Sequence, residues 1–219
     1  NGKDLWITDL KKGRYRSDRE VSPEFIEKFT HRIANLVNKS FNRMNDVLEA
    51  QTEDLRISIV HESAAVTGRS ICIRKSLPEV RNTIDTMLAS RFCSIEILSL
   101  LINCVRSRMN IAFCGEPGVG KTECSKFFTQ FIPENQRVIT IEDNLEMHFH
   151  KINPRNDCVE LQVSNELSYT DAIKLCLRQN PKWIMLSEAR STEVKYLLEQ
   201  WSTGINGFTT LHLDDLRNL

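Results

Sequence analysis

The sequence predicts an α/β fold in which helices wrap a parallel sheet, preceded by a small α+β domain. Two observations indicate this architecture. Downstream of residue 78, short apolar runs alternate with amphipathic stretches of helical period, which is typical of a parallel sheet covered by helices. Upstream, one helical stretch precedes two segments in which every second residue is apolar. The composition, 41% hydrophobic and 26% charged residues over 219 positions, is that of a soluble globular chain large enough for two domains.

The first predicted helix begins at Pro23. Ser22 precedes it as a cap, proline is favoured at the first helical position, and apolar residues follow at helical spacing up to Val37. Residues 55–59 and 71–73 alternate between apolar and polar side chains, so we expect them to form paired strands. One helix with a strand pair indicates a small α+β domain in the first third of the chain.

The segment 76–78 is the best candidate for a linker. Pro78 cannot continue the preceding strand as a central strand, because it has no backbone N–H to donate. We therefore expect an N-terminal α+β domain over residues 1–77 and a second domain over residues 78–219. In the second domain the expected elements are helix 94–108, strand 111–114, a helix after Gly120, strand 138–141, helix 170–179, strand 183–186, helix 193–201 and strand 208–211.

Charge and cysteine usage narrow the class of protein. Lys plus Arg equals Asp plus Glu at 29 each, so no overall field draws the chain to nucleic acid or anionic lipid. The seven cysteines form no Cys-x-x-Cys pair, which indicates reduced thiols and a reducing compartment. The longest apolar stretches are too short to span a bilayer. Because the chain begins with Asn1 rather than Met, we expect it to be part of a longer protein.

One motif carries a specific chemistry. The segment Gly115-Glu116-Pro117-Gly118-Val119-Gly120-Lys121-Thr122 matches the phosphate-binding pattern G-x-x-x-x-G-K-[ST] without a mismatch. It lies between a predicted strand and a predicted helix, where glycines let backbone N–H groups surround phosphate oxygens and the helix start adds a positive dipole end. Lys121 would reach the β- and γ-phosphates, and the Thr122 hydroxyl would bind Mg²⁺. The sequence therefore predicts an ATP and Mg²⁺ site here.

Acidic residues follow two of the predicted strands. Glu142 and Asp143 come after strand 138–141, and Glu188 comes after strand 183–186. The carboxyl ends of parallel strands form the ligand crevice in this architecture, so these carboxylates are expected near the phosphates. Hydrolysis of a nucleotide needs such groups to hold the metal and to orient the attacking water.

These motifs together resemble the secretion traffic ATPases, the motors of type II and type IV secretion, conjugation and pilus assembly. The resemblance covers about residues 55–215. The departures from the family's pattern include Ser187 in place of a glycine and Asn206 in place of the first histidine of the "His box". The segments that carry the resemblance are the phosphate loop, Thr140-Ile141-Glu142-Asp143, Leu177-Arg178-Gln179-Asn180-Pro181, Ser187-Glu188-Ala189-Arg190 and the stretch from Thr203 to His212.

The resemblance implies a RecA-like core and a role for each matched residue. Glu188 would act on Mg²⁺ or its water, together with Thr122, and Glu142 would polarise the attacking water; which of the two glutamates is the general base stays open. His212 would sense the γ-phosphate. Arg190 is implied in catalysis and Arg74 in nucleotide contact, and Arg56 and Arg178 are further candidates for an arginine that reaches nucleotide from the N-terminal domain or a neighbouring subunit.

The resemblance also implies partners and a location. We expect a ring of identical subunits, a hexamer, on the cytoplasmic face of the cell membrane, contacting inner-membrane components of a secretion or pilus apparatus. A mostly helical C-terminal part is expected to follow the present chain. Direct nucleic-acid binding is not expected, because basic and aromatic residues do not interleave. Two alternatives stay open: a nucleotide-binding regulatory or assembly module with weak turnover, and a DNA translocase on the same core.

Overall fold

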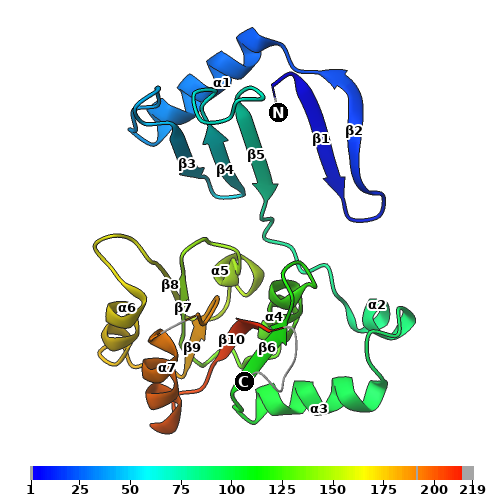
Figure 1. Ribbon diagram of the computed structural model, residues 1–219. Helices are drawn as coiled ribbons and strands as arrows, with labels where there is room; N and C mark the ends of the chain where they lie inside the picture. The colour runs from blue at the N-terminus through cyan, green and yellow to red at the C-terminus, as the bar shows by residue number, and fades with distance from the viewer. Residues whose placement is uncertain (1, 191, 214–219) are drawn as a thin grey trace. The chain divides into compact units, whose positions relative to one another are not determined.

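The computed structural model describes residues 2–190 and 192–213 and divides the chain into two compact units, Asn1–Ser76 and Leu77–Leu219. The first unit holds a two-stranded sheet, a helix and a three-stranded sheet (Figure 1). Its elements are β1 (Asp4–Asp9), β2 (Gly13–Glu20), α1 (Pro23–Leu36), β3 (Val47–Gln51), β4 (Leu55–Val60) and β5 (Ser70–Lys75).

Helix α1 and the sheet β3-β4-β5 form the core of the first unit. Ser22 accepts a hydrogen bond from the backbone N–H of Phe25 and caps α1, as the sequence predicted. The strands are antiparallel, and β4 pairs with both neighbours. Ile33 and Ala34 of α1 belong to one buried cluster with apolar side chains from β3 and β4. The predicted strands 55–59 and 71–73 are confirmed as parts of β4 and β5.

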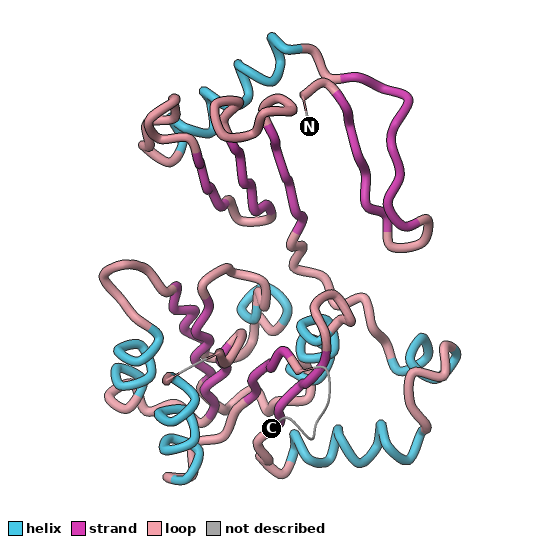
Figure 2. The backbone as a smooth tube through the Cα atoms, viewed as in Figure 1, coloured by secondary structure: helices cyan, strands magenta, loops and turns pink. Residues whose placement is uncertain are grey.

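The second unit contains a parallel sheet with helices on both sides (Figure 2). The alternation predicted from residue 94 onward is confirmed element by element. Helix α2, helix α5 and strand β8 were not expected. The elements are α2 (Ile84–Ala89), α3 (Ile95–Arg106), β6 (Ile111–Gly115), α4 (Lys121–Thr129), β7 (Val138–Glu142), α5 (Phe149–Ile152), β8 (Cys158–Gln162), α6 (Tyr169–Cys176), β9 (Trp183–Leu186), α7 (Glu193–Ser202) and β10 (Phe208–His212).

The strand order of this sheet is β6-β10-β9-β7-β8, and every neighbouring pair is parallel. The last strand in the chain, β10, therefore lies between the first strand, β6, and β9. Its register places His212 beside Gly115 and Thr209 beside Leu186. The carboxyl ends of β6, β10 and β9 consequently meet at one edge of the sheet.

Buried apolar side chains cover both faces of the sheet. Strand β9 illustrates the division: Trp183 and Met185 join the cluster that includes Phe127 of α4, whereas Ile184 and Leu186 join the cluster built with α6 and α7. Successive side chains of a strand point to opposite faces, so a strand buried on both sides reads as a continuous apolar run. This explains why the run of residues 183–186 marked a strand in the sequence.

Four of the cysteines, Cys93, Cys124, Cys158 and Cys176, pack in the apolar clusters, whereas Cys72 is exposed. All seven are free thiols in the structure. Burial raises the pKa of the Cys124 thiol to about 11 and those of Cys158 and Cys176 to about 12, so these thiols stay protonated at neutral pH. Among the helices in the described part of the chain, none is both long and apolar enough to cross a membrane.

Gly207, directly before β10, offers a test of the packing between β10 and β9. A Cβ atom at this position would lie 1.8 Å from the carbonyl oxygen of Ile184 and 2.7 Å from Nε1 of Trp201. Since a backbone carbonyl cannot move aside cheaply, we expect Gly207→Ala to lower the free energy of unfolding by about 1–3 kcal/mol. Urea denaturation followed by tryptophan fluorescence measures the change. Ser99→Ala, at an exposed site of α3, is the control; equal stability of both variants would contradict this packing.

Candidate active site

The phosphate loop joins β6 to α4. Gly118 (φ 82°) and Gly120 (φ 95°) take backbone conformations that favour glycine, and a Cβ atom at either position would meet nothing within 4 Å. A Cβ atom at Gly115 would lie 3.0 Å from Cγ2 of Val119, so the loop also turns tightly. Gly120 is the N-cap of α4, where no side chain caps the helix. The helix start therefore presents its backbone N–H groups toward the space beside the loop.

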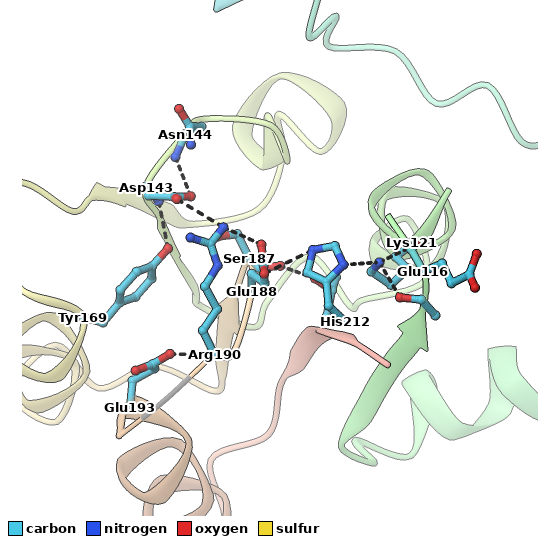
Figure 3. Close-up of polar contacts among 12 residues, drawn as sticks. Glu116, Lys121, Asp143, Asn144, Tyr169, Ser187, Glu188, Arg190, Glu193 and His212 are labelled. Carbon is cyan, nitrogen blue, oxygen red and sulfur yellow. Dashed lines mark hydrogen bonds and ion pairs between the residues drawn. The ribbon is translucent and has the colours of Figure 1, made fainter. Parts of the chain in front are cut away.

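Lys121, the first residue of α4, reaches back across the loop. Its Nζ donates hydrogen bonds to the carbonyl oxygens of Gly115 and Glu116, each at 2.8 Å. It also lies 3.2 Å from Nδ1 of His212 at the end of β10 (Figure 3). Because an ammonium group can only donate, Nδ1 of His212 accepts this bond.

His212 in turn contacts Glu188, which follows β9. With Nδ1 accepting from Lys121, the imidazole carries its proton on Nε2, and Nε2 lies 3.1 Å from Oε1 of Glu188. The contacts join Lys121, His212 and Glu188 in a continuous chain from the phosphate loop to the carboxylate (Figure 3). Three residues that the sequence assigned to separate motifs are thereby brought together.

Glu188 has a second partner on its other oxygen. Oε2 accepts from Nη2 of Arg190 at 2.5 Å. This hydrogen bond, more than any other contact, lowers the pKa of Glu188, and it raises the pKa of Arg190 in return. Glu188 therefore stays ionised at neutral pH, as a group that acts on a metal ion or its water must be.

Arg190 also faces a second carboxylate, that of Asp143. Oδ2 of Asp143 lies 3.5 Å from the same Nη2 atom, and the backbone N–H of Asp143 donates to the hydroxyl of Tyr169 at 3.1 Å. The sequence placed Asp143 among the strand-end carboxylates expected near the phosphates but gave it no individual role, and it did not single out Tyr169. Tyr169 carried no comparable signal, since it directly precedes the predicted helix 170–179.

Glu142, the other expected carboxylate, lies outside this chain of contacts. Its side chain has 0% exposure, and Oε2 accepts from the backbone N–H groups of Glu146 and Met147 at 2.9 and 3.0 Å. The pKa of Glu142 is raised to about 7, mainly by burial and to a smaller extent by the nearby charges of Glu160 and Glu146, while the two backbone hydrogen bonds oppose the shift. Its role in polarising water stays a prediction.

The remaining expected residues occupy varied surroundings. Within the loop, Glu116, Pro117, Gly118 and Val119 are exposed, and Thr122 is half-buried on the first turn of α4. Arg74, on β5, belongs to the first unit and is exposed, so its expected contact with nucleotide stays a prediction.

The residues present fit a nucleotide with a bound Mg²⁺. The glycine conformations, the uncapped start of α4 and the Lys121 ammonium provide donors for phosphate, and Thr122 with Glu188 provides oxygens for a hard cation. Among residues 2–190 and 192–213, no group of three or more His, Cys, Asp or Glu side chains could hold a metal ion. Mg²⁺ characteristically takes few protein ligands and completes its shell with phosphate and water.

A family model described as "Type II/IV secretion system protein" matches residues 40–218. The chain belongs to this family. The resemblance expected from the phosphate loop and the strand-end carboxylates is thus confirmed, and with it membership in the secretion and pilus motor ATPases, which are nucleotide-binding P-loop proteins.

Relatives of this secretion-ATPase chain include proteins with and without an assigned role. An uncharacterized protein of Bacillus anthracis is 28% identical over 217 residues, covering 98% of this chain and 49% of the relative. The protein VirB11 of Rhizobium radiobacter is 32% identical over 139 residues, covering 60% of this chain and 39% of the relative. The chain thus spans about half, or less, of the curated relatives it matches.

Solved structures share the fold of this secretion-ATPase chain. The Legionella pneumophila ATPase DotB aligns with a TM-score of 0.66 at 20% identity, covering 99% of this chain and 63% of that chain. The pilus retraction motor PilT with bound ADP aligns with a TM-score of 0.65 at 18% identity, covering 97% and 64%. These similarities confirm the predicted α/β fold with a parallel sheet and a small N-terminal domain.

The buried acid Glu142 makes the stability depend on pH. Its pKa is raised from 4.5 to about 7, so protonation favours the folded state, and this contribution is lost as pH rises from about 4.5 through 7. The variant Glu142→Gln keeps an oxygen acceptor without a charge. As the pH rises from 5 to 8, we expect its free energy of unfolding to increase by about 3 kcal/mol relative to that of wild type. Urea denaturation at both pH values measures this gain. Glu199→Gln, at an exposed site of α7, is the control. If the free energy of unfolding changed with pH in the same way in both variants, the assignment of this pH dependence to Glu142 would be contradicted.

Proposed function

We propose that this chain is the nucleotide-hydrolysing part of a Mg²⁺-dependent ATPase motor of a bacterial secretion, conjugation or pilus-assembly system. Its subunits would form a ring, a hexamer, on the cytoplasmic face of the inner membrane and contact membrane components of the apparatus. Hydrolysis would drive movement between an N-terminal domain and a P-loop domain, which we equate with residues 1–77 and 78–219. Membership in the secretion ATPase family supports this proposal.

The observation that carries the proposal is the chain of contacts from Lys121 through His212 to Glu188. It connects a phosphate-binding group to an ionised carboxylate through one imidazole that contacts both. A change in the bonding of Lys121 would therefore be felt at Glu188, which is the coupling expected of a γ-phosphate sensor.

The roles of the other residues follow from their chemistry. The chemistry that a bound Mg²⁺ would supply here is positive charge against the charge that develops during phosphoryl transfer. On the protein side, Thr122 and Glu188 would hold the ion, directly or through water, and Arg190 keeps Glu188 ionised. Glu142 stays a candidate for polarising water, and Arg74 for contacting nucleotide.

The second candidate is a nucleotide-binding assembly module with weak turnover, and the motivating departures are Asn206 and Ser187. Asn206 pairs with Trp183 and donates to Oδ1 of Asn110, so it lies before β10, at the end opposite His212. The carbonyl oxygen of Ser187 accepts from Oγ1 of Thr210 at 2.6 Å, which ties β9 to β10. Neither residue forms a contact in the Lys121 to Glu188 chain, and this favours the motor.

Replacing Lys121 tests the proposal directly. We expect Lys121→Ala to lower ATP hydrolysis by about 100-fold or more, because the charge on the transferred phosphate loses its ammonium partner. Phosphate release by the complete protein, with and without EDTA, measures both this loss and the dependence on Mg²⁺. Lys195→Ala, an exposed lysine of α7, should keep wild-type activity.

Two results would decide against the motor. Hydrolysis that survives in Lys121→Ala would exclude the mechanism, and ATP binding by wild type without hydrolysis would favour the assembly module. Stimulation by DNA would instead support a translocase. Size measurement of the complete protein, with and without a non-hydrolysable ATP analogue, tests the ring.

A further inference from the structure

Tyr169 lies where a helix approaches the edge of the sheet that carries the site. It is the first residue of α6, and Ser168 caps this helix by accepting from the backbone N–H of Asp171. The buried face of α6, formed by Ala172, Ile173 and Cys176, belongs to the same apolar cluster as Ile141 of β7. The cap and the packing together fix the position of the Tyr169 ring relative to the end of β7.

The Tyr169 hydroxyl uses this fixed position to hold the backbone of Asp143. The hydroxyl accepts from the Asp143 N–H at 3.1 Å, at the first residue after β7 (Figure 3). Burial, more than any other cause, raises the pKa of Tyr169, so the group stays a neutral hydroxyl at physiological pH. A neutral hydroxyl can hold this backbone without adding a third negative charge near Asp143 and Glu188.

The carboxylate of Asp143 is oriented as well. Oδ1 accepts from the backbone N–H of Asn144 at 2.9 Å, which leaves Oδ2 facing Arg190 at 3.5 Å. The Arg190 backbone is held separately, because its N–H donates to Oε1 of Glu193 at 2.7 Å. With that backbone anchored, the two carboxylates of Asp143 and Glu188 determine where the exposed Arg190 side chain points.

We propose that Tyr169 is a positioning residue for the hydrolysis assigned above to this site. It holds Asp143, Asp143 directs Arg190, and Arg190 fixes Glu188 for its action on the metal-bound water. This inference rests on the proposed function. It adds a residue that touches neither nucleotide nor metal and acts through two intermediaries.

Removal of one hydroxyl tests the proposal. We expect Tyr169→Phe to lower kcat for ATP about 10-fold with KM changed less than twofold, because phosphate binding by the loop is untouched and only the placement of Glu188 is loosened. Asp143→Asn should give a similar loss. The double variant should lose no more than the larger single loss, since both residues act through the same arginine.

Further measurements separate positioning from a general loss of structure. Amide hydrogen exchange at Asp143 should accelerate in Tyr169→Phe, whereas the thermal midpoint should fall by less than about 3 °C. Tyr196→Phe is the matched control, since the Tyr196 ring packs against Nζ of Lys174, and it should leave kcat unchanged.

The outcomes distinguish this proposal from the one it rests on. Lys121-dependent hydrolysis with an unchanged kcat in Tyr169→Phe would overturn the positioning role and leave the proposed function standing. Fully additive losses in the double variant would also overturn it. A wild-type chain without Lys121-dependent hydrolysis would overturn both proposals.

Discussion

The position of β10 between β6 and β9 is the constraint on which the site depends. Neighbouring strands lie about 4.8 Å apart, so the strands that lead to Lys121 and Glu188 are separated by about 10 Å with one strand between them. His212, at the end of that middle strand, fills the interval and contacts both side chains. Any change that altered the strand order or shifted the register of β10 would break the chain of contacts.

The two strand-end glutamates have the same chemical group but differ in burial and in pKa. Glu188 is half-buried beside an arginine, and its pKa is lowered. Glu142 is buried and has a raised pKa, and it accepts hydrogen bonds from two backbone N–H groups of the loop after β7. Environments that push the pKa values of two carboxyl groups apart are a frequent basis for separate acid and base roles. Here the half-buried glutamate, Glu188, is the one that contacts the phosphate-loop lysine through His212.

Secondary structure was predictable where burial imposed a pattern. Strand β9 is apolar throughout because both faces are covered, and α1 begins at Pro23 because Ser22 caps it. Strands β1 and β2 escaped prediction because their residues lie mostly exposed on both faces, so no apolar alternation marks them. Strand β8, an edge strand of its sheet, was not predicted either, although Val159 and Leu161 alternate with polar residues and pack against the buried cluster.

The sequence by itself determined the phosphate loop, the alternation of strands and helices, and the residue types at the strand ends, because local conformation and burial leave direct traces in residue choice. It also carried the family resemblance that the comparison confirmed. The tertiary structure alone decided which of those residues meet. The order of strands brought His212 between Lys121 and Glu188, and the packing of α6 brought Tyr169 to Asp143. Contacts between residues far apart in the chain depend on topology, and no local pattern records them.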